Sequence, residues 1–186
     1  MLLPKLGKKP RHNVDIFGEE AVDSRRRLTE IHIEQARSRA LRLIAFTGAV
    51  FPGEWSQHWS EVLVPDLLEF GFHARKVNEF CGLMNEDFPS INTKVVNISE
   101  GDPGGWEGSY RNALNALMHM RSFVLGHAHA DHRKIFLQAE SNLIAIYIKV
   151  ETDKFPEVTI SIFGLAACFL NYVIPKVREK DRSLRF

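Results

Sequence analysis

Arg111, Asn115 and His119 recur at four-residue intervals and are of types that act on phosphodiesters. In a helix this spacing keeps the three side chains within about 80° of one face, so they could converge on one ligand. An arginine clamps a phosphate, an asparagine orients a ribose hydroxyl or a water, and a histidine exchanges protons near neutral pH. The set suits metal-free cleavage of RNA by attack of the 2′-hydroxyl on the adjacent phosphate. A solvated helix face would give the same pattern, and this alternative stays open.

A second group of reactive residues comprises His127, His129, Asp131 and His132. Three imidazoles and a carboxylate so close together could hold one or two zinc ions and generate a metal-bound hydroxide. The segment matches the His-x-His-x-Asp-His motif of the metallo-β-lactamase fold, which implies a preceding strand and further ligands downstream. No histidine follows His132, and the residues before the motif are expected to be helical. We therefore expect no metal cofactor, and a zinc-dependent hydrolase or a regulatory metal site at these four residues stays an alternative.

The segment 111–119, Arg-Asn-Ala-Leu-Asn-Ala-Leu-Met-His, resembles the motif helix of HEPN domains. In those domains an arginine, often followed by a polar residue, precedes a histidine on the same helix. The segment is particularly similar to bacterial HEPN-like proteins with an Arg-x-x-x-Asn-x-x-x-His helix, a β-hairpin and a terminal helix. Residues 72–80 resemble the second helix of that group. The resemblance covers roughly residues 63–175.

The resemblance implies a mainly α fold, an antiparallel HEPN-like helical bundle with a small C-terminal β-hairpin and a terminal helix. It also implies a homodimer whose motif helices face each other, and RNA cleavage in a defence or toxin–antitoxin system. A cognate antitoxin or another defence-system protein would then be a partner besides RNA. Carried over residue by residue, the motif assigns Arg111 to clamp the phosphate, His119 to act as acid or base, and Asn112 or Asn115 to orient the substrate.

Two residues of the second helix, His73 and Arg75, would join this site as substrate contacts. The chain departs from the commonest HEPN motif because Arg111 and His119 lie one helical step further apart. Some HEPN-like domains only bind nucleic acid or a partner protein. A non-catalytic module for protein interaction or dimerisation is therefore the alternative to a metal-independent endoribonuclease or RNA-binding effector.

Length and composition predict one domain. With 186 residues, 45% of them hydrophobic and 25% charged, the chain suffices for one core, which we expect in residues 19–186 after a basic tail in residues 1–18. The 24 Lys and Arg against 23 Asp and Glu exclude a global electrostatic attraction to nucleic acid or membrane. Local basic runs at 25–27 and 176–182 are interpreted as solvated helix faces.

The two cysteines and the longest apolar run predict the compartment. Cys81 and Cys168 lie among apolar residues, so we interpret them as buried thiols and expect a reducing, cytoplasmic setting. No apolar segment near the start indicates a secretory signal. The apolar run Val158–Ile174 is short for a bilayer span and contains polar residues, so it is interpreted as a core strand leading into a helix, with no membrane partner.

Periodicity predicts the elements that must position these residues. Apolar residues at three- and four-residue spacing predict helices over 19–51 and about 63–84, separated by the Pro-Gly pair at 52–53. A loop follows, with a short strand predicted at 93–98, and then a helix over 107–123 that divides into an apolar and a polar side. β-Branched and aromatic residues predict a hairpin of 142–151 with 158–163, and a last helix follows from 164 to 177.

Overall fold

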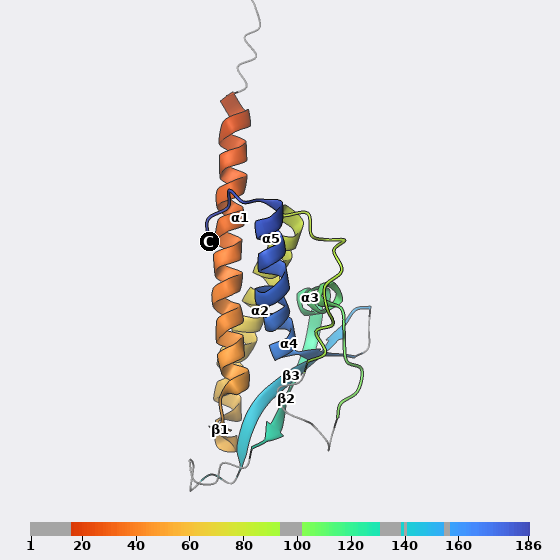
Figure 1. Ribbon diagram of the computed structural model, residues 1–186. Coiled ribbons are helices and arrows are strands. Elements are labelled where there is room, and N and C mark those ends of the chain that lie inside the picture. The colour runs from red at the N-terminus through yellow and green to blue at the C-terminus, as the bar shows by residue number, and fades with distance from the viewer. Residues whose placement is uncertain (1–15, 94–101, 131–138, 140, 155–156) are drawn as a thin grey trace, which may run out of the picture.

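The computed structural model of this chain describes residues 16–93, 102–130, 139, 141–154 and 157–186. Its helices are α1 (Ile16–Gly48), α2 (Ser56–Phe80), α3 (Tyr110–Met118), α4 (Ile162–Cys168) and α5 (Ile174–Lys180). Its strands are β1 (Phe51–Pro52), β2 (Met120–His129), β3 (Asn142–Thr152) and β4 (Val158–Ser161). The helices α1, α2 and α4–α5 run side by side, and the sheet crosses one end of them (Figure 1).

The α1–α2 pair is an antiparallel seam with a seven-residue repeat. Residues that meet across it are Arg25 and Phe80, His32 and His73, Arg39 and Asp66, and Phe46 and Trp59. Each step advances seven residues along α1 and retreats seven along α2. The buried positions of α1 alternate by four and three, at 29, 33, 36, 40, 43 and 47. A strict three-and-four alternation keeps one stripe of a helix against its partner, so local pattern and packing agree here.

The predicted bounds of these two helices need small corrections. α1 begins at Ile16 instead of residue 19 and ends at Gly48, three residues before the predicted end. α2 spans Ser56–Phe80 instead of about 63–84, and Pro65 lies inside the helix. The predicted tail ends accordingly before residue 16, and residues 1–15 lie outside the described part of the chain.

The four strands form one antiparallel sheet with β3 at its centre. β2 pairs with β3 along its length, from Met120 opposite Thr152 to His129 opposite Leu143. β1 and β4 pair with the other edge of β3 at its two ends. The buried residues of β3, such as Ile148 and Val150, extend the helical core onto the sheet. The predicted hairpin of β3 and β4 is confirmed, whereas the strand predicted at 93–98 lies almost wholly outside the described residues.

The prediction of a mainly α, HEPN-like helical bundle is wrong, because the sheet makes this a mixed α/β fold. The error begins at the helix predicted over 107–123. α3 ends at Met118, and β2 occupies residues 120–129. Phe123, Val124 and Leu125 favour extended backbone once β3 offers a ladder of hydrogen bonds, and tertiary pairing overrides the helical pattern.

The C-terminal third joins strand to helix as predicted. β4 passes directly into α4, whose N-terminus is capped by the Ser161 hydroxyl, which accepts the Gly164 N–H at 3.0 Å. A π-helical turn, Phe169–Val173, connects α4 to α5, so the terminal rod reaches Lys180 instead of Val177. Phe169 packs edge-on against Phe70 of α2 and ties this rod to the helical seam. Within the described residues no helix is both long and apolar enough to cross a membrane.

Candidate functional site

The short helix α3 holds the polar stripe predicted from the sequence. Its N-cap is Ser109, whose hydroxyl accepts the Asn112 N–H at 3.3 Å. One side of α3 is buried in the core through Tyr110, Ala113, Leu114 and Leu117. The opposite side is thereby turned outward. His119 is the C-cap, and its backbone N–H donates to the Asn115 carbonyl at 3.1 Å.

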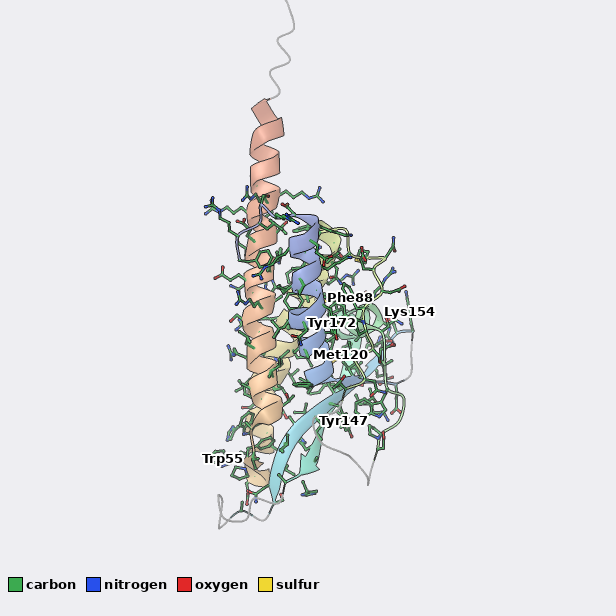
Figure 2. The ribbon with its side chains drawn as sticks, in the orientation of Figure 1. Trp55, Phe88, Met120, Tyr147, Lys154 and Tyr172 are labelled. Atoms are coloured by element: carbon green, nitrogen blue, oxygen red, sulfur yellow. The ribbon has the colours of Figure 1, made fainter. Side chains whose placement is uncertain are left out.

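A cleft of about 350 Å³ runs along the outward side of α3. Three segments form its walls. They are α2 with Arg75, α3 with the polar residues on it and at its ends, and the β3–β4 turn. The polar lining residues are Arg75, Glu107, Asn112, Asn115, His119, Thr152, Asp153 and Lys154. Segments far apart in the sequence thus place cations, amides, carboxylates and an imidazole around one hollow. Figure 2 shows the Lys154 side chain at the β3–β4 turn, on the side of the molecule away from α1.

The cleft carries charges of both signs. Thr152 pairs with Met120, so the β3–β4 turn with Lys154 lies beside the His119 end of the helix. Glu107 lies at the other end, where its carboxylate accepts the Ser109 N–H at 2.8 Å. The nine residues of α3 separate these ends by about 13.5 Å. Arg75 and Lys154 are thus the cations of the cleft, and its carboxylates are Asp153, beside Lys154, and Glu107, before the start of α3.

Arg75 is held in place by its own helix. Its Nε donates to Glu79 Oε1 at 3.1 Å, and Lys76 Nζ contacts the other oxygen of Glu79 at 2.7 Å. The Lys76 hydrogen bond, followed by that of Arg75, lowers the pKa of Glu79, so the carboxylate stays charged across the neutral range. The Arg75 side chain is about one-third exposed. One edge of its guanidinium is thus fixed while the group still borders the cleft.

Two of the predicted site residues lie elsewhere. Arg111 is exposed and does not line the cleft. On a helix wheel with Arg111 at 0°, Asn115, His119 and Asn112 fall at about 40°, 80° and 100°, so the cleft is centred roughly a quarter-turn from the arginine. His73 faces α1 instead, where its Nδ1 lies 2.8 Å from Nδ1 of His32. The cleft therefore unites Arg75, Asn112, Asn115 and His119 without Arg111 and His73.

The His32–His73 pair is an apolar-flanked contact in the α1–α2 seam. The edges of the Phe72 and Phe80 rings meet the His32 imidazole. Burial lowers the pKa of both histidines, and nearby positive charge adds to this, from Lys76 for His32 and from His32 itself for His73. A hydrogen bond between two Nδ1 atoms needs one protonated and one bare nitrogen, so the pair is favoured with at least one ring neutral.

The alternative metal site is described only in part. His127 lies on β2 with its ring edge against Phe51, its Nε2 buried without a described partner, and burial lowers its pKa. His129 is exposed two residues further along the strand, whereas Asp131 and His132 fall outside the described residues. The described residues contain no group of three or more metal-ligating side chains. The expectation of a helix before this motif is wrong, because the histidines end a strand.

Both cysteines are partly or fully inside the fold. Cys168 is buried and Cys81 is partly buried, and the two are free thiols. Burial raises the pKa of Cys81 to about 11 and that of Cys168 to about 12. Since the thiolate is the nucleophile, neither thiol suits nucleophilic chemistry at neutral pH.

Sequence reasoning missed half of the polar lining. Glu107, Asp153 and Lys154 belong to a loop and a hairpin turn with no periodic signal of their own, and Thr152 ends the strand before that turn. The hairpin was predicted, but its contact with α3 depends on Met120 pairing with Thr152, and that pairing was hidden by the helix predicted through residue 123. A correct strand prediction for 120–129 would have placed the turn beside His119.

No family model, curated protein or solved structure matches this chain. The function must accordingly be argued from the side chains of the cleft.

Proposed function

We propose that the chain binds single-stranded RNA in the α3 cleft and cleaves it without a metal ion, as a cytoplasmic endoribonuclease or RNA-binding effector. The observation that carries the proposal is that Arg75 from α2 and the Asn112, Asn115 and His119 side of α3 line one cleft. Phosphoryl transfer to a 2′-hydroxyl needs a positive clamp, a proton-transfer group and positioning groups, and these residue types supply them.

The proposed chemistry uses the cations, the amides and the imidazole of the cleft. Arg75 and Lys154 bind the non-bridging oxygens of the scissile phosphate near His119, and the Asn115 amide orients the ribose. The 2′-oxygen forms a bond to phosphorus and gives up its proton, the P–O5′ bond breaks, and the departing 5′-oxygen takes up a proton. His119 either accepts the first proton, with water protonating the 5′-oxygen, or donates the second, with water accepting the proton of the 2′-hydroxyl. The products are a 2′,3′-cyclic phosphate and a 5′-hydroxyl.

Two arginine variants test which guanidinium serves the site. Arg75→Ala is expected to reduce both RNA affinity and cleavage, because it removes the clamp of the cleft, whereas Arg111→Ala should leave both nearly unchanged. Arg111 is an exposed arginine of the adjacent helix α3 that does not line the cleft, which makes it a matched control. Loss of cleavage in Arg111→Ala with retention in Arg75→Ala would contradict the assignment and restore the clamp expected from the HEPN-like motif.

The resemblance of residues 111–119 to the HEPN motif extends this proposal to a biological setting. A ribonuclease of a toxin–antitoxin or antiviral defence system would slow growth when produced alone and would be silenced by a cognate partner. Expression of the wild-type chain is expected to inhibit growth, and expression of His119→Ala is not. Equal growth with both chains would remove the support for a toxin role while leaving RNA binding to be judged by itself.

A second candidate function is a non-catalytic module that forms a homodimer or docks a protein through the α3–β2 corner. The observation that favours it is the exposure of large apolar side chains there, at 39% for Met118, 44% for Phe123 and 63% for Val124. A stable dimer that Phe123→Ser and Val124→Ser dissociate, in a protein that neither binds nor cleaves RNA, would support this candidate over the first.

A further inference from the structure

The last six residues of the chain fold back across α1. The Arg26 guanidinium donates to the Ser183 carbonyl, and the Arg185 backbone N–H donates to Glu30 Oε1 at 2.9 Å. The Phe186 carbonyl oxygen accepts a hydrogen bond from Arg178 at 3.1 Å, and its ring lies under the same guanidinium. Figure 1 shows the C-terminal trace leaving α5 and reaching α1. Two segments that are about 150 residues apart in sequence are thereby fixed side by side.

This contact places two basic segments of the sequence side by side. The α1 run supplies Arg25, Arg26 and Arg27, and the C-terminal segment supplies Arg182 and Arg185. All are exposed except Arg26, which is half-buried. Figure 2 shows nitrogen-tipped side chains gathered around α1 where the C-terminal segment crosses it. The chain has a formal net charge of only +1, so five arginines at one place polarise the molecule.

Two acidic residues at this basic end, Glu30 and Asp181, form hydrogen bonds within the fold. Glu30 accepts the Arg185 N–H, which lowers its pKa. Asp181 accepts the N–H and the hydroxyl of Ser183 at 2.9 and 2.6 Å, and these bonds lower its pKa as well. Both carboxylates therefore hold the C-terminal segment in place. The guanidinium groups of Arg27 and Arg182 have no ion pair with any described residue and are available to an anion from outside.

The basic end borders a groove of about 480 Å³, which lies between α1, the end of α2 and the C-terminal segment. Two of the five arginines, Arg25 and Arg26, line it together with Lys180, Asp181 and the apolar side chains of Phe80 and Leu184. Arginine forks match phosphate oxygens, and an apolar floor below them accommodates a base. A concave surface of this kind fits a polynucleotide better than a flat bilayer.

We propose that the basic end, formed by Arg25, Arg26, Arg27, Arg182 and Arg185, is a second RNA-binding surface that holds the phosphate backbone of single-stranded RNA outside the cleft. This inference rests on RNA being the ligand of the proposed function, but it does not require cleavage. α2 contributes to both sites, Arg75 to the cleft and Phe80 to the groove, and the two residues lie about 140° apart around the helix. A strand must therefore pass around α2 to reach from the cleft to the basic end.

The test measures binding of the full chain to a 20-nucleotide, 2′-O-methylated RNA, which cannot be cleaved through its 2′-oxygens, between about 50 and 200 mM salt. The variant is Arg27→Ala with Arg182→Ala. Its matched control is Arg37→Ala with Arg42→Ala, because both are exposed arginines of α1 that line neither the cleft nor the groove. Each phosphate contact on a single strand contributes about 0.7 to the slope of log affinity against log salt. The variant is expected to lose about 1.4 of that slope and about tenfold in affinity, and the control is expected to keep both.

The outcomes separate this inference from the proposed function. An equal slope in variant and control would overturn the inference, and so would binding to anionic phospholipid vesicles in place of RNA. No RNA binding by the wild type would overturn both proposals. A trinucleotide, too short to reach the basic end, should be cleaved equally by wild type and by the Arg27/Arg182 variant, whereas His119→Ala should not cleave it. Loss of binding slope with unchanged trinucleotide cleavage would support both proposals.

Discussion

The α1–α2 seam and the α3–β2 corner show opposite relations between sequence and structure. In the seam, the residues that the three-and-four pattern places on one helix face are the ones that pack against the partner helix. Contacts repeat every seven positions from Arg25–Phe80 to Phe46–Trp59. In the corner, a polar stripe that continues in helical register to Ser122 is cut at Met118, and the chain becomes a strand. Packing in the seam stabilises the fold, whereas the corner carries polar side chains that line the cleft.

The difference has a physical cause. A long helix buries its stripe against a neighbour whose own stripe is visible in the sequence, so both helices could be predicted. Whether residues 119–123 extend a helix or begin a strand depends on β3, which lies more than 20 residues away in the sequence. Sites assembled by such distant pairing are hidden from local patterns.

The largest expected effect lies where the seam meets the C-terminal rod. Phe70 is fully buried and packs edge-on against Phe169. Phe70→Ala should lower the free energy of unfolding by about 3–5 kcal/mol, because it removes buried apolar surface and leaves a cavity. Urea unfolding followed by circular dichroism measures this. A loss below about 1 kcal/mol would mean that the seam and the rod do not share a core.

A smaller loss of stability is expected from a steric clash at Gly164 in α4. A Cβ added at Gly164 would lie 1.8 Å from the Ile91 carbonyl oxygen, a backbone atom that cannot rotate away. Gly164→Ala should therefore destabilise the fold by about 1–3 kcal/mol or more in urea unfolding, and Gly48→Ala, where a Cβ meets nothing within 4 Å, is the control. Equal stability of the two variants would contradict the close approach of the 91 loop to α4.

The next effect is a pH dependence confined to the seam. Burial lowers the pKa of His32 and His73, so the unfolded chain binds protons more readily than the folded chain below about pH 6.5. Their contribution to stability is thus complete above that pH and is lost as the pH falls through and below it. The double variant His32→Gln and His73→Gln should flatten the fall of the melting temperature between pH 7 and 5.

His58 provides the control for this pH series, because its side chain is 80% exposed and it pairs with Glu61 on the surface of α2. His58→Gln should keep the wild-type fall of the melting temperature. A double variant as pH-sensitive as the wild type would show that proton uptake elsewhere, for example at the half-buried His127, governs acid stability.

The smallest effect should be a gain. Gly71 lies inside α2, and a Cβ there would meet only the Leu117 side chain, at 3.4 Å. Gly71→Ala should stabilise the fold by about 0.5–1 kcal/mol, because alanine loses less backbone entropy in a helix. Thermal and urea unfolding check the sign. A net loss would indicate that α3 packs on α2 without room for a methyl group, which would tie the corner more tightly to the seam.

Particular residues show how far the sequence could lead. The heptad of Ile33, Ala36, Ala40 and Leu43 predicted the seam, and the alternation after Asn142 predicted the hairpin. Spacing also identified Asn115 and His119 as neighbours on one face of α3. It could not exclude Arg111, because the residues of α3 that line the cleft are decided by the neighbouring segments that form its walls.

The rest depended on tertiary contacts. Lys154 reaches the cleft only because Thr152 pairs with Met120, and Arg182 meets α1 only because the C-terminal segment folds back on Arg26 and Glu30. Neither contact leaves a periodic trace in the sequence. Both sites depend on hydrogen bonds between segments that are distant in the sequence. Such contacts could not be predicted from a single sequence.

The most direct test of the central claim is cleavage of single-stranded RNA by the purified chain in EDTA, with wild type and His119→Ala compared at equal stability. We expect the wild type to produce 2′,3′-cyclic phosphate ends in the chelator and His119→Ala to produce none. Cleavage that disappears in EDTA would point instead to a metal site such as the His127–His129 strand end, and equal cleavage by both proteins would contradict the role given to the α3 cleft.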